Sequence, residues 1–438
     1  MKRFHELRDA IHVFVRMDSP ERRVVDSPAV QRLRHIQQLA LTSLIYPGAT
    51  HRRFEHSLGV MELAGRIYDV VASKDLRPDV KEALQVDLAD PGERKYWRRA
   101  VRLAALCHDT GHLPFSHAAE KDLLPDGWHH ERLTESWLES QYMSEIFAEM
   151  IPPVKPEHVI KLAVGPRKLT KAWSFSTWEA ILSEIIVGDA FGADRMDYLL
   201  RDSLHAGVAY GRFDHFRLVD TLSILPSVAG EELGEPVLGV EEGGLLSAEA
   251  LVHARYLMYS QVYLHAVRRI YDIHLKDFLA AWLPGGKFPI TLDEYFSLTD
   301  NEVTVAIMRA STDSSQPGHD AARRIAQRKH FRVLYQRTPH DQAVNPQAVR
   351  AVFREARKQF GAEHVRMDEY FPKADTHDFP VLMRDDRVAS SLQLSESLSR
   401  SLLAPIGYVF VSPEKVKDAR VWLNKNREDL IKNQDHES

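Results

Sequence analysis

The chain of 438 residues is 44% apolar and 27% charged, which predicts a globular protein with one large core and a smaller second unit. Its formal net charge of −5 argues against binding through bulk positive charge, so a nucleic-acid partner is not indicated. The first residues lack the apolar core of a signal peptide, and no run of about 18 apolar residues could span a bilayer, so we expect a cytoplasmic protein without membrane contact.

The first part of the chain carries helical periodicity. Ser27 and Pro28 have the character of an N-cap and a first helical residue, which predicts a helix that ends at Leu41. After His56, apolar residues recur at i, i+3, i+4, i+7 and i+11, which predicts a helix with one buried stripe. The stripe consists of Val60, Leu63, Ala64, Ile67 and Val71.

Three further helices are predicted in the middle of the chain. From Trp97, steps of four, three and four residues lead to His108, which therefore continues the apolar stripe of its helix. Residues 178–202 are apolar at first and then polar, while the helical spacing continues throughout. A long helix capped by Ser247 is expected to run to about Leu279.

Strand-like segments interrupt the helical pattern in two places. Apolar stretches with several glycines and acidic residues at residues 221–244 predict a short hairpin or an excursion between helices. Nearer the C-terminus, HFRVLY, FPVLMR and IGYVFV have strand character, and helices are predicted after Asn345-Pro346 and Ser412-Pro413. We therefore predict a mainly α protein, with a helical domain at residues 1–325 and a smaller α+β unit with a short polar tail at residues 326–438.

Two segments combine histidines with carboxylates, RRFEHSLG at residues 52–59 and LCHDTGHLPFSH at residues 106–117, and a third segment, ADRMDYLLRD at residues 193–202, supplies further carboxylates. A lone histidine on an apolar helix face is more often a hydrogen-bonded core residue than a ligand, and a lone aspartate near a helix end is usually a cap. The ordered set favours a metal site, because imidazoles and carboxylates together suit a divalent metal that binds phosphate oxygens and a water. The only cysteine is Cys107, so nitrogen and oxygen ligands are required.

These motifs resemble the HD-domain phosphohydrolases, and within them the branch of deoxynucleoside triphosphate triphosphohydrolases. The resemblance covers about residues 7–279 and is carried by QRLRHIQQL, YPGATHRRFEHSLG, HDTGHLPFSH and DRMDYLLRD. It implies a helical HD core and a divalent metal ion, whether iron, manganese, zinc, nickel or magnesium. Four side chains are implied as its ligands: His56, His108, Asp109 and Asp194.

The resemblance also implies which residues surround the reacting phosphate. They are three histidines and one acidic residue: His112, His117, His130 and Glu120. Because a histidine holds or gives up a proton near neutral pH, one of the three is expected to protonate the leaving oxygen. The family usually has aspartate at the position of Glu120, and the longer side chain could alter how His117 is oriented.

By the same resemblance, three arginines grip the phosphates of the substrate: Arg53, Arg195 and Arg255. Guanidinium groups bind phosphate oxygens through paired, charge-assisted hydrogen bonds. Any one of the three alone would suit an ordinary surface salt bridge, and the position of Arg195 is often lysine in the family.

The sugar and the base have their own implied contacts. Tyr198 contacts phosphate or sugar, whereas Gln38 and Asp202 bind the sugar. Tyr198 and Asp202 lie four and eight residues after the aspartate ligand of the same helix, so one helix face can present all three. Leu39 matches a residue that crowds the ribose 2′ edge. Tyr263 matches an aromatic that closes on sugar and base, although core packing explains it equally well.

The implied reaction is attack of a metal-activated water on the α-phosphorus of a deoxynucleoside triphosphate, which releases a deoxynucleoside and intact triphosphate. Two alternatives stay open: an HD-type phosphohydrolase or phosphodiesterase that acts on another nucleotide or a nucleic-acid end, and a low-turnover nucleotide-binding regulator. The regulator would use the basic residues 323–337 to contact a partner. The proton-donating histidines argue against pure binding, and the resemblance alone predicts a homo-oligomer.

The amino-terminal segment departs from the family pattern. Regulated members have proline and glycine in the turn that here reads RDAIHV at residues 8–13, and this turn helps to form an activating nucleotide site. The loss of both residues argues against nucleotide activation. Asp9, Arg22 and Arg23 could still form a nucleotide pocket, but a solvated charged loop is the favoured interpretation.

Overall fold

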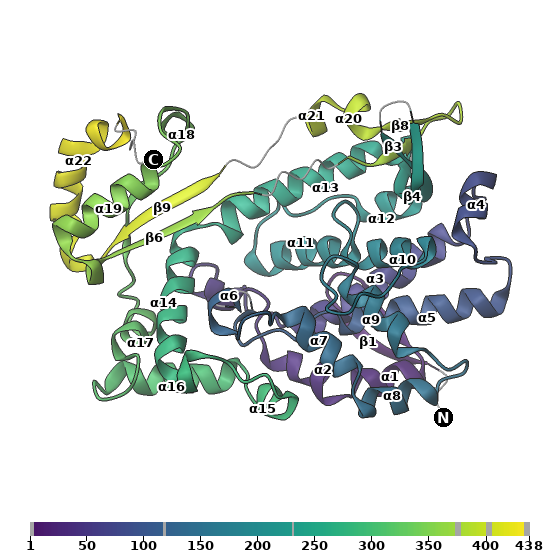
Figure 1. The fold of residues 1–438 in the computed structure, drawn as a ribbon, viewed down its shortest axis with the longest axis horizontal. Helices are drawn as coiled ribbons and strands as arrows, with labels where there is room; N and C mark the ends of the chain where they lie inside the picture. Colours follow the sequence, from purple (N-terminus) through teal and green to yellow (C-terminus); the bar gives the residue numbers. More distant parts are fainter. Residues whose placement is uncertain (1–3, 117–119, 230–231, 373–377, 400–404, 433–438) are drawn as a thin grey trace. The chain divides into compact units, whose positions relative to one another are not determined.

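The computed structural model describes residues 4–116, 120–229, 232–372, 378–399 and 405–432 (Figure 1). The chain forms two compact units that are interleaved along the sequence. The core unit comprises Met1–Met258, Phe288–Glu302 and Thr376–Arg400, and the carboxyl unit comprises Tyr259–Lys287, Val303–Asp375 and Ser401–Ser438. The division at residues 325 and 326 stays a prediction.

The core unit is mainly helical. Its described helices are α1 (Ser19–Val25), α2 (Pro28–Arg32), α3 (Arg53–Val71), α4 (Pro78–Leu84), α5 (Pro91–Cys107), α6 (Glu120–Leu123), α7 (His130–Leu138), α8 (Gln141–Ala148), α9 (Pro156–Val164), α10 (Thr177–Val187), α11 (Ala193–Ala206), α12 (His215–Thr221), α13 (Leu245–Met258), α15 (Leu292–Phe296), α20 (Ser391–Leu394) and α21 (Glu396–Ser399). Its strands form a hairpin, β1 (His5–Asp9) with β2 (Val13–Met17), and a sheet in the order β3 (Leu222–Ala229), β4 (Glu232–Glu241), β7 (Pro380–Leu382) and β8 (Val388–Ser390). The antiparallel pairing of β3 with β4 confirms the predicted hairpin.

Helices α3 and α5 pack against each other at the centre of the core unit. The apolar stripe predicted for α3, from Val60 to Val71, is buried. Helix α5 starts at an N-cap, Asp90, whose side chain accepts a hydrogen bond from the amide of Gly92 at 2.9 Å. It ends with His108 as its C-cap, so the predicted helix through Trp97 carries this histidine at its C-terminal end.

The prediction of one continuous helix that ends at Leu41 is wrong beyond α2. Three short elements replace it: α2, a 3-10 turn at Leu33–His35 and a 3-10 turn at Ala40–Leu44. Between the two 3-10 turns the backbone pairs with the segment before α3, where the amide of Gln38 donates to the carbonyl of His51 at 3.0 Å. These tertiary hydrogen bonds outweigh the local helical propensity of the segment.

Two other predicted helices are each divided. The segment 178–202 is divided into α10 and α11, because α10 ends before Gly188. Only glycine fits at this position, since a Cβ there would lie 2.4 Å from the carbonyl oxygen of Glu184. The helix predicted at residues 247–279 is divided into α13, a π-helical turn at Tyr259–Tyr263 and α14 (Ala266–Trp282). The side chain of His265 caps α14 by accepting a hydrogen bond from the amide of Val267 at 3.2 Å. The apolar periodicity continues across both breaks, so the sequence pattern did not indicate where either helix ends.

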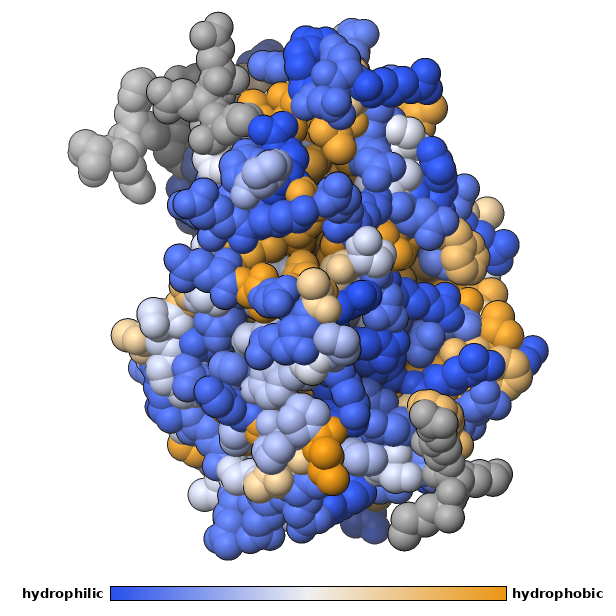
Figure 2. All heavy atoms as spheres, turned by 90° about the vertical axis from the view of Figure 1, so that its right-hand side faces the viewer, coloured by the Kyte–Doolittle hydropathy of each residue, from blue (hydrophilic) through white to orange (hydrophobic). Residues whose placement is uncertain are grey.

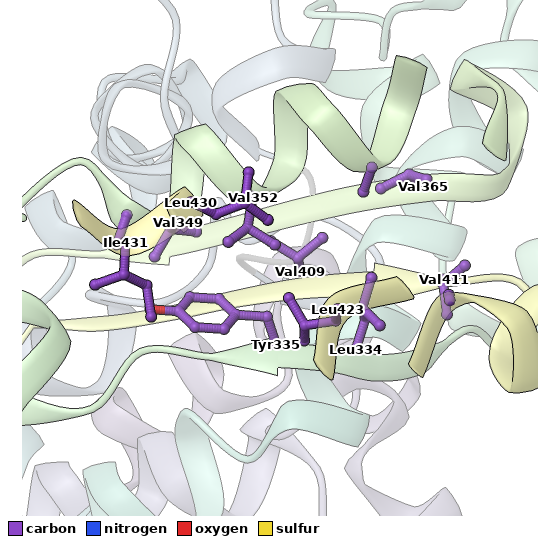
Figure 3. Close-up of a cluster of buried hydrophobic side chains, with 13 residues drawn as sticks. Leu334, Tyr335, Val349, Val352, Val365, Val409, Val411, Leu423, Leu430 and Ile431 are labelled. Carbon is purple, nitrogen blue, oxygen red and sulfur yellow. The ribbon is translucent and has the colours of Figure 1, made fainter. Parts of the chain in front are cut away.

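The carboxyl unit has the predicted α+β character. Its elements include α14, α17 (His319–Ala326), β5 (Arg332–Gln336), α18 (Pro339–Val344), α19 (Ala348–Phe360), β6 (Val365–Tyr370), β9 (Ile406–Val411) and α22 (Val416–Lys432), and α16 (Asp300–Thr312) begins in the core unit and continues here. The three strands form an antiparallel sheet in the order β5, β9, β6. Side chains of this sheet, α19 and α22 form one buried cluster, which includes Val352, Val409 and Leu423 (Figure 3).

Hydrophilic side chains predominate on the face of the molecule that Figure 2 shows, and hydrophobic ones gather there in scattered groups. Several large apolar side chains are fully buried, among them Trp178, Phe115 and Phe147. Within the part of the chain that the structure describes, no helix has the length and apolar character needed to cross a membrane.

Candidate metal centre and its surroundings

Three helices bring the predicted metal ligands together (Figure 1). His56 lies near the N-terminus of α3, His108 caps the C-terminus of α5 and Asp109 follows it. Asp194 lies in the first turn of α11. Because α3 packs against both α5 and α11, residues from three separate motifs meet.

The ligand atoms of these four residues converge. Nε2 of His56 lies 3.1 Å from Oδ1 of Asp194 and 3.6 Å from Oδ2 of Asp109. Nε2 of His108 lies 3.3 Å from Oδ1 of Asp109 and 3.5 Å from Oδ1 of Asp194. The donor set of two imidazoles and two carboxylates matches the nitrogen and oxygen ligands of a divalent metal.

The orientation of both rings also fits a metal. Nδ1 of His56 donates to Oδ2 of Asp197 at 2.8 Å, and Nδ1 of His108 donates to the carbonyl of Ala105 at 2.7 Å. In the neutral ring, which is the form that binds a metal, these bonds leave the lone pair of Nε2 directed toward the carboxylates. Among the described residues, the buried Nε2 of His108 has no hydrogen-bond partner, which a coordinated cation would satisfy. The residues present therefore fit a divalent cation.

The charges of the cluster are concentrated enough to shift its pKa values. Burial alone would lower the pKa of His56, but hydrogen bonds with Asp194 and Asp197 raise it to about 10. Burial would raise the pKa of Asp194, yet His108 and His56 hold it well below its usual range. Both shifts reflect several carboxylates that face two imidazoles, a field that attracts a cation.

A buried carboxylate outside the predicted set, Asp197, anchors His56 from the other side of its ring. Asp197 accepts hydrogen bonds from Nε2 of His12 at 2.7 Å and from Nε and Nη2 of Arg201 at 2.8 and 2.9 Å. Arg201 also donates to Asp9 at 2.9 Å. The hairpin of β1 and β2 is therefore hydrogen-bonded to the residue that orients a candidate metal ligand.

The placement of Asp9 corrects an expectation. Its side chain is buried and paired with Arg201, so its interpretation as part of a solvated loop is wrong. Arg22 and Arg23 do lie at the surface, where they pair with Asp26 and Glu149, respectively.

The described histidines that were predicted to surround the phosphate form a stacked pair beside the cluster. The ring centroids of His112 and His130 lie 4.0 Å apart, with 17° between the planes. Nε2 of His112 lies 3.1 Å from Oδ1 of Asp109. Oε1 of Glu120 accepts hydrogen bonds from both Nδ1 and the backbone amide of His130, at 2.7 Å each. His117 lies outside the described residues.

Glycine at position 111 allows α7, which carries His130, to approach this turn. A Cβ on Gly111 would lie 2.1 Å from the carbonyl oxygen of His130 and 2.6 Å from the amide nitrogen of Thr134. Oγ1 of Thr134 accepts from the amide of Gly111 at 3.0 Å and donates to the carbonyl of His108 at 3.2 Å. Any larger residue would push α7 away from the turn.

The three candidate phosphate-binding arginines each have a carboxylate neighbour. Arg53 is buried and pairs with Asp109, and its Nε donates to Oγ of Ser116 at 2.7 Å. Nη2 of Arg195 lies 3.5 Å from Oδ1 of Asp189. Burial would raise the pKa of Asp189, but the positive charges of Arg195, Arg167 and Arg255 lower it.

The candidate sugar contacts lie on α11 and on the segment before α3. Asp202 is buried on α11, and Nε2 of His51 donates to its Oδ1 at 2.7 Å. Tyr198 is half-buried on the same helix. Gln38 and Leu39 are buried, and Oε1 of Gln38 has no hydrogen-bond partner among the described residues.

The functions predicted for single residues stay predictions, including that of Tyr263, which belongs to the carboxyl unit. Two residues that contact the predicted set were missed. Asp197 could have been found, because it follows Asp194 by three residues and so lies on a neighbouring face of the same helix. His51 has no such spacing signal, since its partner Asp202 is remote in sequence.

Two family models match the chain. Residues 53–165 match the model described as HD domain, and residues 213–369 match the model described as HD associated region. The candidate metal ligands His56, His108 and Asp109 lie within the first match, whereas Asp194 lies between the two.

Several known proteins are similar to the chain. An uncharacterised protein of Methanocaldococcus jannaschii is 34% identical over 270 residues, which cover 62% of this chain and 48% of that protein. The deoxynucleoside triphosphate triphosphohydrolase SAMHD1 of Homo sapiens is 28% identical over 370 residues, which cover 77% of this chain and 56% of that protein. The chain spans about half the length of the curated relatives it matches.

A solved structure has a similar fold. The crystal structure of a hypothetical protein from Aquifex aeolicus matches with a TM-score of 0.77 and 31% sequence identity, covering 96% of this chain and 100% of that one.

Proposed function

Because this chain belongs to the HD-domain family, we propose that it is a metal-dependent phosphohydrolase that converts a deoxynucleoside triphosphate to a deoxynucleoside and triphosphate. One observation carries the proposal: two imidazole Nε2 atoms and two carboxylates converge beside the stacked pair of His112 and His130. A cation site alone would suit a structural role, but groups that transfer protons next to it suit hydrolysis. The likeness to a deoxynucleoside triphosphate triphosphohydrolase supports the choice of substrate.

His56, His108, Asp109 and Asp194 would hold the divalent cation, whose identity among iron, manganese, zinc, nickel and magnesium the donor set leaves open. When bound, such a cation neutralises charge on phosphate oxygens and makes an attacking water more acidic. Asp197 and the carbonyl of Ala105 hold the two imidazole rings in the orientation that coordination requires.

The arginines bind and orient the triphosphate in this proposal. Arg53 pairs with Asp109 and Arg195 lies beside Asp189, so a phosphate group can replace or join the carboxylate at each of these two guanidiniums. Paired hydrogen bonds to phosphate oxygens hold the α-phosphorus near the cluster and leave little freedom for other orientations.

Hydrolysis at the α-phosphorus needs a proton for the departing 5′ oxygen of the sugar. Nδ1 of His130 donates to Glu120, so Nε2 is the ring atom that can hold and give up that proton. Nε2 of His112 is directed toward Asp109 instead. We therefore favour His130 as the proton donor, with Glu120 as its positioning residue and with His112 and His117 as the alternatives.

Selection of a deoxynucleotide is assigned to the sugar side of the site. Asp202, held by His51, would accept a hydrogen bond from the 3′ hydroxyl, and the side-chain amide nitrogen of Gln38 would donate one to the same oxygen. Leu39 would crowd a ribose 2′ hydroxyl, which a deoxyribose lacks. Tyr263 would close on the sugar and base.

The proposal also includes a homo-oligomeric assembly, which is supported by the family resemblance alone. A measurement of the molecular mass in solution tests it.

The proposal is tested by a screen that separates products. The full chain is incubated with each dNTP, each NTP and each candidate metal, and the nucleoside and phosphate products are resolved. Deoxynucleoside plus intact triphosphate supports the proposal. Release of orthophosphate, or turnover only with another nucleotide or a nucleic-acid end, favours the alternative hypothesis of an HD-type phosphohydrolase or phosphodiesterase with a different substrate. Tight nucleotide binding without turnover under any of these conditions favours the regulator.

A further inference from the structure

A segment far along the chain contacts the backbone around the candidate metal centre. Phe288–Glu302 belongs to the core unit, although the preceding stretch, Tyr259–Lys287, belongs to the carboxyl unit. Three of its residues hydrogen-bond to residues 32–37 or 111–115, and we call them the clasp: Tyr295, Leu298 and Asp300. Helix α15, which contains Tyr295, packs against α2 and α7 (Figure 1).

Asp300 joins two segments that are remote from each other in sequence. Its carboxylate is buried, with Oδ1 accepting from the amide of Phe115 at 2.7 Å and Oδ2 accepting from the amide of Gln37 at 2.7 Å. Gln37 directly precedes the candidate sugar contact Gln38, and Phe115 lies three residues after His112. One side chain therefore sets the distance between the sugar side and the histidine side of the site.

Tyr295 bonds directly to a carbonyl group of the same turn, whereas Leu298 is linked to another through Arg32. The hydroxyl of Tyr295 donates to the carbonyl of Gly111 at 2.6 Å. Nη1 of Arg32 donates to the carbonyl of His112 at 2.9 Å, while its Nε and Nη2 donate to the carbonyl of Leu298 at 3.0 and 2.8 Å. The guanidinium of Arg32 lies 4.8 Å from the centre of the Tyr295 ring.

The turn that the clasp contacts has a strained backbone. Phe115 and Ser116 have φ values of +57° and +59°, in the left-handed region that costs free energy for residues with a Cβ. Such a conformation persists only where the surroundings hold it. Asp300 holds Phe115 by its amide, and Oγ of Ser116 donates to the carbonyl of Gln37 at 2.8 Å.

On the premise of the proposed function, we propose that Asp300 is a positioning residue for hydrolysis, which aligns Gln38 with the turn that carries His112. Tyr295 assists it through the carbonyl of Gly111. The clasp lies within residues 213–369, which match the HD associated region. In this assignment, that region contributes to catalysis by positioning residues of the site. Asp300 contacts neither substrate nor metal in this role, because both of its carboxylate oxygens are directed to backbone amides.

Asp300→Asn tests the assignment, because asparagine keeps the shape but offers only one acceptor oxygen for two amides. We expect kcat to fall by at least about ten-fold, since misplacement of catalytic groups by 1 Å can cost about 100-fold in rate. Hydrogen exchange measured by mass spectrometry should quicken in peptides that contain Gln37 and Phe115. The matched control is Asp293→Asn, the same change at an exposed position of α15, which should behave as the wild type in both measurements.

The two readouts separate the possible results. A slower reaction together with faster exchange at both peptides, at a temperature where circular dichroism shows a folded protein, supports the assignment. Normal kcat and normal exchange in Asp300→Asn overturn it, and so does a lower Tm without either local change. If the wild type hydrolyses no nucleotide, the proposed function fails, and the exchange measurement alone then decides whether Asp300 holds the two segments together. Should Asp300→Asn not fold, Tyr295→Phe provides the same pair of readouts.

Discussion

The metal cluster and the clasp both contact the turn at residues 108–116, but through different groups. The cluster uses side chains, since imidazole nitrogens and carboxylates meet there. The clasp uses the backbone of the turn, because Asp300 and Tyr295 bond to the amide of Phe115 and to the carbonyl of Gly111. A substitution in the cluster removes a ligand, whereas a substitution in the clasp leaves every ligand present and changes only where the turn lies. The two regions should therefore differ in whether metal is lost together with activity.

The largest effect is expected for His108→Ala, which removes a proposed metal ligand. Turnover should fall by at least about 1000-fold, because the Lewis-acid contribution of a metal amounts to several kcal/mol. The metal content of the purified protein, measured by elemental mass spectrometry, should fall together with the turnover. His340→Ala, at an exposed position in the carboxyl unit, is the control and should retain both. Unchanged turnover in His108→Ala would mean that the active site lies elsewhere.

Asp197→Asn should have a smaller effect, because all four ligands remain. His56 loses its charged acceptor at Nδ1, and loss of such a partner typically weakens metal affinity by about 10- to 100-fold. Titration calorimetry with the active metal measures this change. The protein should also unfold more easily, since Arg201 and His12 lose a charged partner in a buried network. Asp220→Asn, an exposed change on α12, is the control, and wild-type affinity in Asp197→Asn would show that Asp197 does not orient His56.

The two regions also differ in how far the sequence predicts them, and the reason is physical. His56, His108 and Asp194 lie in short motifs on helices, so spacing indicates which side chains share a face. The bonds of Asp300 go to backbone amides, which no side-chain pattern encodes. The same bonds explain the failure of the helix predicted to end at Leu41. The amide of Gln37 donates to Asp300, far along the chain, where a helix would direct it to a carbonyl four residues earlier.

The pH dependence of stability should distinguish the clasp from the cluster. Burial raises the pKa of Asp300 to about 6, although the amides of Gln37 and Phe115 and the charges of Arg52 and Arg32 lower it. The unfolded carboxyl has a pKa of about 3.9, so between about pH 4 and 6 the folded protein binds more protons and becomes less stable as pH rises. Asp300→Asn lacks this contribution.

Urea denaturation of both proteins at a series of pH values tests the sign. Between pH 7 and pH 4, the unfolding free energy of the wild type relative to Asp300→Asn should increase by about 2 to 3 kcal/mol, at 1.36 kcal/mol per pKa unit. Parallel curves, or a relative loss of wild-type stability at low pH, would show that Asp300 does not titrate as a buried clasp carboxyl.

The smallest effect is expected for Tyr295→Phe, and it isolates alignment from stability. The hydroxyl of Tyr295 donates to the carbonyl of Gly111 at 2.6 Å, and that of Tyr68 donates to the carbonyl of Arg94 at 3.0 Å. Both tyrosines are buried, so each change to phenylalanine should lower the unfolding free energy by about 1 kcal/mol. Only Tyr295→Phe should also reduce kcat, by several-fold and with the metal content unchanged, because only Gly111 lies in the turn that carries His112, whose ring stacks on the favoured proton donor His130. Equal kcat values in the two variants would show that the clasp contributes to stability alone and does not align the catalytic groups.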